Sequence, residues 1–159
     1  MCVTDADWAS NKDDRRSISG FCIKYGNSPI LWKSIKQSCV ALSTMEAEFI
    51  SIAQCSREAI WIQMLLRELF PNNGEQKILI KSDNQAAISF VKSSIVSSRS
   101  KHIDIRNHFV RDLLAEGRLE VQYIPTEENE ADILTKPLVK EKTFIFSKRL
   151  GVITQGGIC

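Results

Sequence analysis

The stretch Lys77-Ile78-Leu79-Ile80-Lys81-Ser82-Asp83 predicts a strand that ends in an acidic residue. Directly after Asn84, the residues Gln85 to Val91 have the apolar spacing of a short helix. A strand that leads straight into a helix is a connection found in α/β proteins, where helices cover the faces of a sheet. This stretch therefore favours an α/β fold and places one carboxylate at the end of a strand.

Upstream of this stretch the sequence predicts three strands and a long helix. Cys2 to Thr4 gives a short first strand, and Phe21 to Tyr25 pairs with Ile30 to Trp32 as a hairpin. Ser43-Thr44-Met45-Glu46 fits a capping box, in which the serine hydroxyl and the glutamate carboxylate satisfy free N–H groups at the start of a helix. Pro71 ends that helix.

Downstream, the pattern predicts two further helices and one strand. A helix runs from about Ile103 to Glu116, with Gly117 in the position of a C-terminal glycine. Leu119 to Ile124 alternates apolar and polar residues as a strand does, and a final helix starts near Glu128 and stops before Pro137. The whole order predicts an α/β domain with a mixed sheet.

The composition is that of one globular domain. The chain has 159 residues, of which 43% are hydrophobic and 25% are charged, within the usual range for such a domain. We expect residues 1–151 to form it and residues 152–159 to be a C-terminal tail. No apolar run approaches the roughly 20 residues of a membrane helix, and the N-terminus lacks a secretory or transit pattern. We therefore expect a soluble, intracellular protein that does not contact a membrane.

Charge and cysteine content point to no particular ligand. The net charge of +2 does not by itself indicate a nucleic-acid-binding protein. No two cysteines form a C-x-x-C pair, and both histidines lie far from any of them, which argues against a zinc site. We expect reduced and mostly buried thiols. The cysteines are Cys2, Cys22, Cys39, Cys55 and Cys159.

Four acids occupy positions from which they can converge. Asp5 ends the first strand, Asp83 ends the fourth, Glu48 lies one turn into the long helix, and Asp132 lies in the final predicted helix. Several carboxylates that share a buried site require a cation or strongly raised pKa values. Oxygen ligands without sulfur or clustered histidine favour Mg²⁺ or Mn²⁺. Because acids are common, spacing alone leaves this site as one possibility among several.

Five segments carry a resemblance when they are taken together and in order. The chain resembles the ribonuclease H domain of copia-type LTR retrotransposon Pol polyproteins, of the plant kind, over residues 3–151. The segments are Thr4-Asp5-Ala6-Asp7-Trp8, Ser43-Thr44-Met45-Glu46-Ala47-Glu48-Phe49, Ser82-Asp83-Asn84-Gln85-Ala86-Ala87, Lys101-His102-Ile103-Asp104-Ile105-Arg106 and Ala131-Asp132-Ile133-Leu134-Thr135-Lys136-Pro137-Leu138.

The resemblance implies a ribonuclease H-like fold: a five-stranded mixed sheet, its first three strands antiparallel, flanked by helices. It implies an endonuclease that hydrolyses the RNA strand of RNA/DNA hybrids with two Mg²⁺ or Mn²⁺ ions. It also implies a reverse transcriptase domain as a neighbour in the parent polyprotein. By the same resemblance the expected location is the cytoplasm or a virus-like particle.

Carried over by motif, the resemblance assigns the catalytic metal ligands to Asp5, Glu48, Asp83 and Asp132. In the long helix Glu46 competes with Glu48. We favour Glu48 because the apolar and small residues that follow it match the family pattern better, whereas Glu46 has a capping role. Similarly, we favour Asp5 over Asp7 because Asp5 directly follows a threonine.

Several polar side chains near these acids are candidate contacts to the sugars and phosphates of a hybrid. Helix capping and solvated charge are the competing interpretations for each of them. The tryptophans Trp32 and Trp61 are expected in the core rather than as stacking surfaces. The candidate contacts are Ser43, Asn84, Gln85, Lys36, Lys101 and Arg106.

Two alternative functions remain open from the sequence. The first alternative is an inert nucleic-acid-binding or relic module of the same fold. The second is an integrase-like core that uses Asp83 and Glu120. The integrase interpretation places Glu120 within a strand and leaves Glu48 and Asp132 without a role. The inert module predicts that replacing Asp83 changes nothing.

Overall fold

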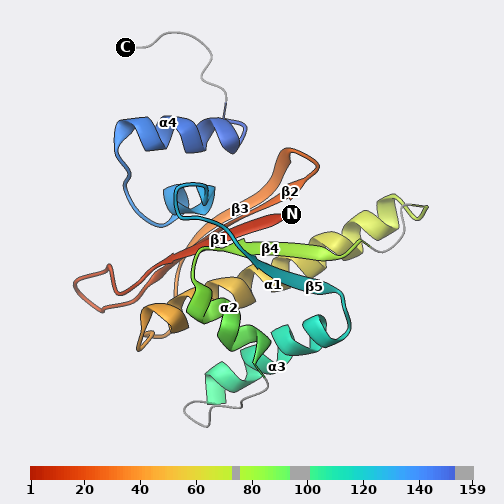
Figure 1. Cartoon of the computed structure of the whole chain (residues 1–159), viewed down its shortest axis with the longest axis horizontal. Helices are drawn as coiled ribbons and strands as arrows, with labels where there is room; N and C mark the ends of the chain where they lie inside the picture. The colour runs from red at the N-terminus through yellow and green to blue at the C-terminus, as the bar shows by residue number, and fades with distance from the viewer. Residues whose placement is uncertain (73–75, 94–100, 153–159) are drawn as a thin grey trace.

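The computed structural model describes residues 1–72, 76–93 and 101–152, apart from the side chains of residues 101–104 and 107. Strands and helices follow each other in the order shown in Figure 1. The elements are β1 (Cys2–Asp7), β2 (Ile18–Tyr25), β3 (Ser28–Lys36), α1 (Thr44–Leu69), β4 (Ile78–Ser82), α2 (Gln85–Lys92), α3 (Lys101–Ala115), β5 (Leu119–Tyr123), the 3₁₀ helix η1 (Glu130–Leu134) and α4 (Lys140–Arg149).

One mixed sheet of five strands organises the chain, in the order β3-β2-β1-β4-β5. The first three strands pair antiparallel, whereas β4 pairs parallel with β1 and with β5. The expected α/β class and the mixed sheet with its antiparallel first half are confirmed. Because β1 lies at the centre of the sheet, Asp5 has β2 on one side, where it pairs with Gly20, and β4 on the other.

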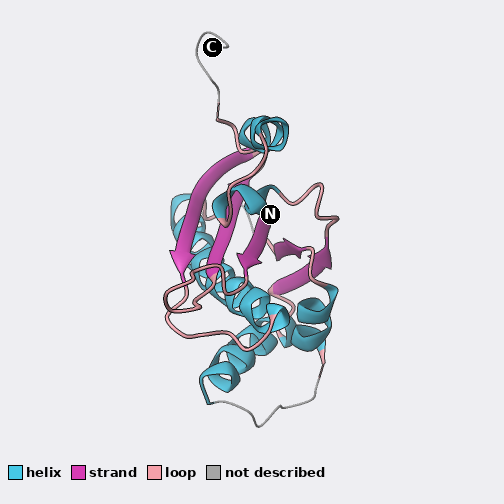
Figure 2. Ribbon diagram, turned by 90° about the vertical axis from the view of Figure 1, so that its left-hand side faces the viewer, coloured by secondary structure: helices cyan, strands magenta, loops and turns pink. Residues whose placement is uncertain are grey.

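The two faces of the sheet are covered by different helices. α1 packs on β1, β2 and β4, while α2 and α3 pack beside α1; together they enclose the main apolar core. η1 lies on the opposite face against β1 and β2, with α4 packed on it (Figures 1 and 2). The central strands β1 and β2 are therefore buried on both faces, whereas edge strand β3 alternates between exposed and half-buried residues.

The long helix begins at a cap that differs in one detail from the expected capping box. The hydroxyl of Ser43 accepts a hydrogen bond from the Glu46 N–H at 3.2 Å, as expected. The Glu46 carboxylate instead accepts from the N–H of Leu42, one residue before the cap, at 2.9 Å. The N–H group that the Glu46 carboxylate binds is thus one residue earlier than in a capping box, and Glu46 still has a structural role at the helix start.

The C-terminal part of the chain corrects one prediction. The expected final helix from Glu128 is instead a short 3₁₀ helix, Glu130–Leu134, and the residues Thr126 to Glu128 ahead of it form a turn. The sequence reading also missed α4, which lies beyond Pro137. In α4 only Phe146 is buried, so this helix shows almost no apolar periodicity in the sequence.

The tryptophan prediction is wrong. Trp32 is 63% exposed and Trp61 is 55% exposed, on β3 and α1 respectively. Trp32 lies on an edge strand, and Trp61 lies on the solvent-facing side of α1, between Ala59 and Ile62, whose side chains belong to the main core. Within the described residues, no helix combines the length and apolar character that crossing a membrane requires.

A buried ion pair joins the second face of the sheet to α4. Lys24 on β2 pairs with Glu130 of η1, and both side chains are less than a tenth exposed. The Lys24 ammonium also donates to the carbonyl of Arg149 in α4 at 3.0 Å. A buried charge without its partner is costly, so these contacts keep η1 and α4 in a fixed position on β2.

Candidate metal centre

Three acidic side chains meet at one edge of the sheet. Asp5 lies on β1, Asp83 follows β4, and Glu48 lies near the start of α1. Because β1 and β4 are parallel neighbours, residues at their C-terminal ends share an edge. One carboxylate oxygen of each residue lies within 4.8 Å of the other two. We call these three residues the acid cluster.

Helix α1 is held against β1 close to the acid cluster. Ser51, three residues after Glu48, donates from its hydroxyl to the Asp5 carbonyl at 2.8 Å. The hydroxyls of Thr4 and Ser51 lie 2.6 Å apart. Directly after β3, the buried amide of Gln37 donates to the Ala47 carbonyl at 2.9 Å. These contacts fix the position of Glu48 relative to Asp5.

Burial and mutual repulsion disfavour ionisation of the acid cluster. Asp5 and Glu48 are 3% and 4% exposed. Burial raises the pKa of Glu48 to about 9, and the nearby charges of Asp5 and Asp83 contribute to the rise. Burial also raises the pKa of Asp5 to about 6, although the hydrogen bond from Thr135 and the charge of Lys136 lower it. A bound cation would reverse this bias, because it favours the ionised form of each acid.

The donor set fits a hard divalent cation. A search of the described residues for acidic, histidine and cysteine side chains that lie close enough together to share an ion finds the acid cluster. Glu48 Oε2 is buried without a hydrogen-bond partner, so one of its oxygens is available as a ligand. Carboxylate oxygens without sulfur or imidazole are the ligands that Mg²⁺ and Mn²⁺ prefer.

The described cysteines take no part in this cluster. Cys2, Cys22 and Cys55 are buried free thiols and Cys39 is a partly buried one, in line with the expectation of reduced thiols. Cys159 lies outside the described residues.

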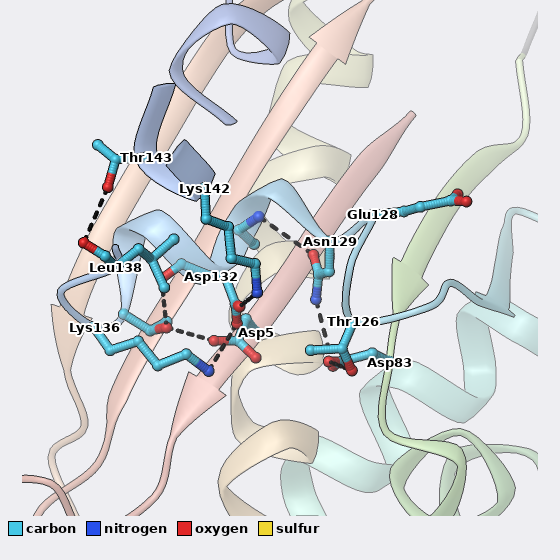
Figure 3. A network of polar contacts seen from close by, with 12 residues as sticks. Asp5, Asp83, Thr126, Glu128, Asn129, Asp132, Lys136, Leu138, Lys142 and Thr143 are labelled. Carbon is cyan, nitrogen blue, oxygen red and sulfur yellow. Dashed lines mark hydrogen bonds and ion pairs between the residues drawn. The ribbon is translucent and has the colours of Figure 1, made fainter. Parts of the chain in front are cut away.

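Asp83 is oriented by the turn that leads into η1 (Figure 3). The Thr126 hydroxyl donates to Asp83 Oδ2 at 2.7 Å. Asn129 is fully buried, and its amide donates to the Thr4 carbonyl at 3.0 Å and to Asp83 Oδ1 at 3.4 Å. The turn therefore connects the ends of β1 and β4, the two strands that carry Asp5 and Asp83.

Asp5 is oriented from the other face of the sheet. The hydroxyl of Thr135, directly after η1, donates to Asp5 Oδ2. This contact requires η1 to approach β2 closely, and Gly20 makes the approach possible. A Cβ atom at Gly20 would lie 2.6 Å from Thr135 Cγ2 and 2.8 Å from Leu134 Cβ.

Asp132 lies beside the acid cluster but is not part of it. Its charge is near enough to raise the pKa of Asp5, yet its own oxygens face two lysines (Figure 3). Lys136 Nζ lies 2.8 Å from Oδ1, and Lys142 Nζ lies 2.6 Å from Oδ2. Burial by itself would raise the pKa of Asp132, but hydrogen bonds from both lysines outweigh burial and lower it. The structure thus brings together three of the four predicted acids and gives Asp132 ammonium partners.

The acids that competed for these roles lie elsewhere. Glu46 is engaged at the start of α1. Asp7 ends β1 outside the acid cluster. Glu120, the acid of the integrase interpretation, is partly exposed on β5 and pairs with Lys77 at 3.1 Å. An arrangement that combines Asp83 with Glu120 therefore has no support in the geometry.

Two of the candidate substrate contacts serve as helix caps. The Ser43 hydroxyl caps α1, and Asn84 Oδ1 accepts from the Ala87 N–H at 2.9 Å at the start of α2. Ser43 caps the helix that carries Glu48, and Asn84 directly follows Asp83. Each cap therefore also fixes the backbone near one of the acids. Gln85, next in the chain, is exposed.

The basic candidates lie on different elements of the fold. Lys36 on β3 pairs with Asp14 at 2.9 Å and is exposed. Arg106 on α3 donates to the Cys39 sulfur at 3.7 Å. Lys101 belongs to α3, but its side chain lies outside the described part of the structure.

The residues that support the acids were not identified from the sequence. Thr126, Asn129, Thr135 and Lys142 contact the acids across separations of 10 to 130 residues. Thr135 and Lys136 do fall in the last segment of the resemblance, which is the one signal that could have indicated two of these positions.

Sequence comparison finds close relatives among transposon polyproteins. The chain is 38% identical over 149 residues to the retrovirus-related Pol polyprotein from transposon TNT 1-94 of Nicotiana tabacum. It is 40% identical over 149 residues to that from transposon RE1 of Arabidopsis thaliana. Each match covers 94% of this chain but only 11% and 10%, respectively, of the polyprotein. The chain thus spans about a tenth of these relatives, and no protein-family profile matches it.

Comparison with solved structures finds the same fold in ribonucleases H. LC11-RNase H1, isolated from compost, superposes with a TM-score of 0.61 at 14% identity, covering 84% of this chain and 90% of that one. A foamy viral protease-reverse transcriptase in complex with an RNA/DNA hybrid gives 0.59 at 18% identity, covering 84% of this chain and 19% of that one. At these identities the similarity shows the fold alone.

Proposed function

We propose that this chain, whose homologues are retrovirus-related Pol polyproteins of plant transposons and whose fold is that of RNase H domains, is a metal-dependent ribonuclease H. Its reaction is hydrolysis of the RNA strand of an RNA/DNA hybrid. The observation that carries the proposal is the acid cluster, in which Asp5, Glu48 and Asp83 converge from β1, α1 and the end of β4.

Asp5, Glu48 and Asp83 would hold two Mg²⁺ or Mn²⁺ ions, with Asp132 beside them as a fourth acid. Such ions lower the pKa of a bound water and stabilise the charge that develops on a phosphodiester. The contribution of the chain is orientation. Thr135 holds Asp5, and the turn with Thr126 and Asn129 holds Asp83, so the acids are arranged before the substrate arrives.

The substrate and its recognition follow from the relatives and from the surface around the acids. LC11-RNase H1 and the foamy viral enzyme each have a structure in complex with an RNA/DNA hybrid. A hybrid presents 2′-hydroxyls in a wide minor groove and phosphates on both strands. Exposed Gln85, two residues after Asp83, is well placed to contact a sugar, and Lys36, Lys101 and Arg106 are the proposed phosphate contacts.

We propose residues 1–151 as the catalytic domain, with a reverse transcriptase domain as its neighbour in a parent polyprotein. The partial coverage of the plant polyproteins and the match to one part of the foamy viral protease-reverse transcriptase support this context.

The test is a cleavage assay on matched duplexes. The purified chain is incubated with an RNA/DNA hybrid, a DNA duplex and an RNA duplex of the same sequence, each end-labelled on either strand, in Mg²⁺ or in EDTA. We expect cleavage of the RNA strand of the hybrid in Mg²⁺ and no cleavage in EDTA.

Two other outcomes identify the alternatives. A folded chain that binds the hybrid but cuts no strand is the inert module, which overturns the proposed activity. Cutting or joining of DNA strands points to an integrase-like core, which the position of Glu120 on β5 opposes.

A further inference from the structure

The ion pairs of Asp132 form a second group of charges beside the acid cluster. The Asp132 side chain is 1% exposed, whereas those of Lys136 and Lys142 are 38% and 30% exposed. A buried carboxylate without a counter-charge is costly, so some cation must accompany Asp132. In this structure the two ammonium groups fill that role.

The two lysines reach Asp132 by different routes. Lys136 lies four residues along the chain, so η1 and the turn after it bring the pair together locally. Lys142 comes from α4, and its place at Asp132 depends on how that helix is packed. Phe146 anchors α4 in the interior, and the ammonium of Lys142 also lies 5.1 Å from the centre of the Phe146 ring.

We propose that Lys142 is a built-in counter-cation that competes with a divalent cation for Asp132. With Lys142 in place, Asp132 stays outside the acid cluster, which the other three acids form without it. Because the Lys142 side chain is partly exposed, its ammonium can leave toward solvent without opening the core. Asp132 is then free to act as a ligand.

This inference rests on the proposed function only in taking the acid cluster as a site for divalent cations. It gives α4 a role beyond packing, since the helix supplies the charge that a metal ion must displace. Lys142 is thus a positioning residue that acts on the metal site through Asp132.

The test measures cation binding without substrate. Mn²⁺ binding by calorimetry is compared for the full chain, Lys142→Gln and Lys140→Gln. Lys140 is exposed on the same helix and has the same charge, so its replacement controls for a general loss of positive charge. We expect Lys142→Gln to bind Mn²⁺ on the order of fivefold more tightly, the upper end of what a solvent-accessible ion pair contributes, and Lys140→Gln to stay within about twofold of the unmodified chain.

Two further variants show whether the effect passes through Asp132. Lys142→Arg keeps the charge and is expected to bind Mn²⁺ as the unmodified chain does. In an Asp132→Asn background, Lys142→Gln is expected to give no further gain, because the competition has been removed. Circular dichroism and thermal denaturation show that each variant is folded.

The inference is overturned if Lys142→Gln binds Mn²⁺ no more tightly than Lys140→Gln, or if its gain persists in the Asp132→Asn background. Absence of Mn²⁺ binding in the folded Lys142→Gln variant overturns it as well. Hydrolysis of a hybrid by the same samples tests the proposed function separately, since a chain that binds Mn²⁺ without cutting RNA loses only the activity.

Discussion

Glu48 is the residue whose ionisation the fold opposes most clearly. Burial, with the charges of Asp5 and Asp83, raises its pKa from the ordinary value of 4.5 to about 9. The folded chain therefore binds a proton more tightly than the unfolded chain. The stability linked to this proton is fully present below pH 4.5 and is lost as the pH rises to about 9.

Replacing Glu48 with glutamine is expected to flatten the pH dependence of stability. In EDTA, the unmodified chain should lose more of its free energy of unfolding between pH 5 and pH 8 than Glu48→Gln does, by up to about 4 kcal/mol. Chemical denaturation at each pH measures the difference. Parallel curves for the two proteins would contradict the raised pKa of Glu48.

A divalent cation should reverse this trend in the unmodified chain. Because Mg²⁺ favours ionised carboxylates, the rise in melting temperature on adding Mg²⁺ should be larger at pH 8 than at pH 6. In Glu48→Gln the rise should be smaller at both values. An equal rise in both proteins would mean that Mg²⁺ binds away from Glu48.

At the scale of elements, the contact between η1 and β2 determines the position of Thr135 and Asp132. Gly20 lies opposite Asp5 on β2 and has almost no free space above it. Its role is close approach rather than an unusual backbone angle. The contact matters for the site because Thr135, directly after η1, donates to Asp5.

Gly20→Ala is expected to push η1 away from the sheet. We expect the free energy of unfolding to fall by roughly 1 to 3 kcal/mol, which is typical of overpacking. We also expect the rate of hybrid cleavage to fall by a larger fraction than the free energy of unfolding, because the Thr135 contact to Asp5 is stretched. Thr135→Ser removes the methyl group that the new Cβ would meet and keeps the hydroxyl. Combined with Gly20→Ala, it should restore part of both properties.

Thermal denaturation and cleavage assays on the single and double variants measure this. Ser34→Ala, at the exposed position that pairs with Gly20 on β3, serves as a control. Wild-type stability and activity in Gly20→Ala would show that η1 does not need this close contact.

The elements differ in how far the sequence could predict them. The strand that leads to Asp83 and the cap at Ser43 have strong local signals, so the acids they position could be predicted as well. Helix α4 has no such signal, because its one buried residue is Phe146 and its position depends on contacts to η1 and β2. Lys142 could not be connected to Asp132 for the same reason.

At the scale of the whole molecule, the acid cluster depends on a sheet order that brings distant segments together. β1 and β4 are neighbours although 70 residues separate their ends at Asp7 and Ile78. The local pattern predicts each strand but not its partner in the sheet. The expected sheet came from the resemblance of the five segments to a ribonuclease H domain. The exposure of Trp32 shows the same limit, because an edge position is a property of the complete sheet.

The proposed domain boundary can be tested by shortening the chain. A chain that ends at Val152 should keep its melting temperature and its hybrid cleavage, because it retains every strand and helix from β1 to α4. A chain that ends at Val139 loses α4, exposes apolar surface of η1 and removes the Arg149 carbonyl from Lys24. Its melting temperature should fall by several degrees, on the order of 2 to 4 °C for each kcal/mol of stability lost in a domain of this size. An equal effect of both truncations would place the boundary elsewhere.

The most direct test of the central claim is the rate at which Asp83→Asn cuts the RNA strand of a hybrid in Mg²⁺. The substitution removes one charge from the acid cluster, and Asp112→Asn makes the same change at an exposed position on α3. We expect Asp83→Asn to lose at least about a hundredfold in rate while its melting temperature and circular dichroism stay those of a folded chain, and Asp112→Asn to keep the full rate. Unchanged cleavage by Asp83→Asn would contradict the assignment of Asp5, Glu48 and Asp83 as the metal centre.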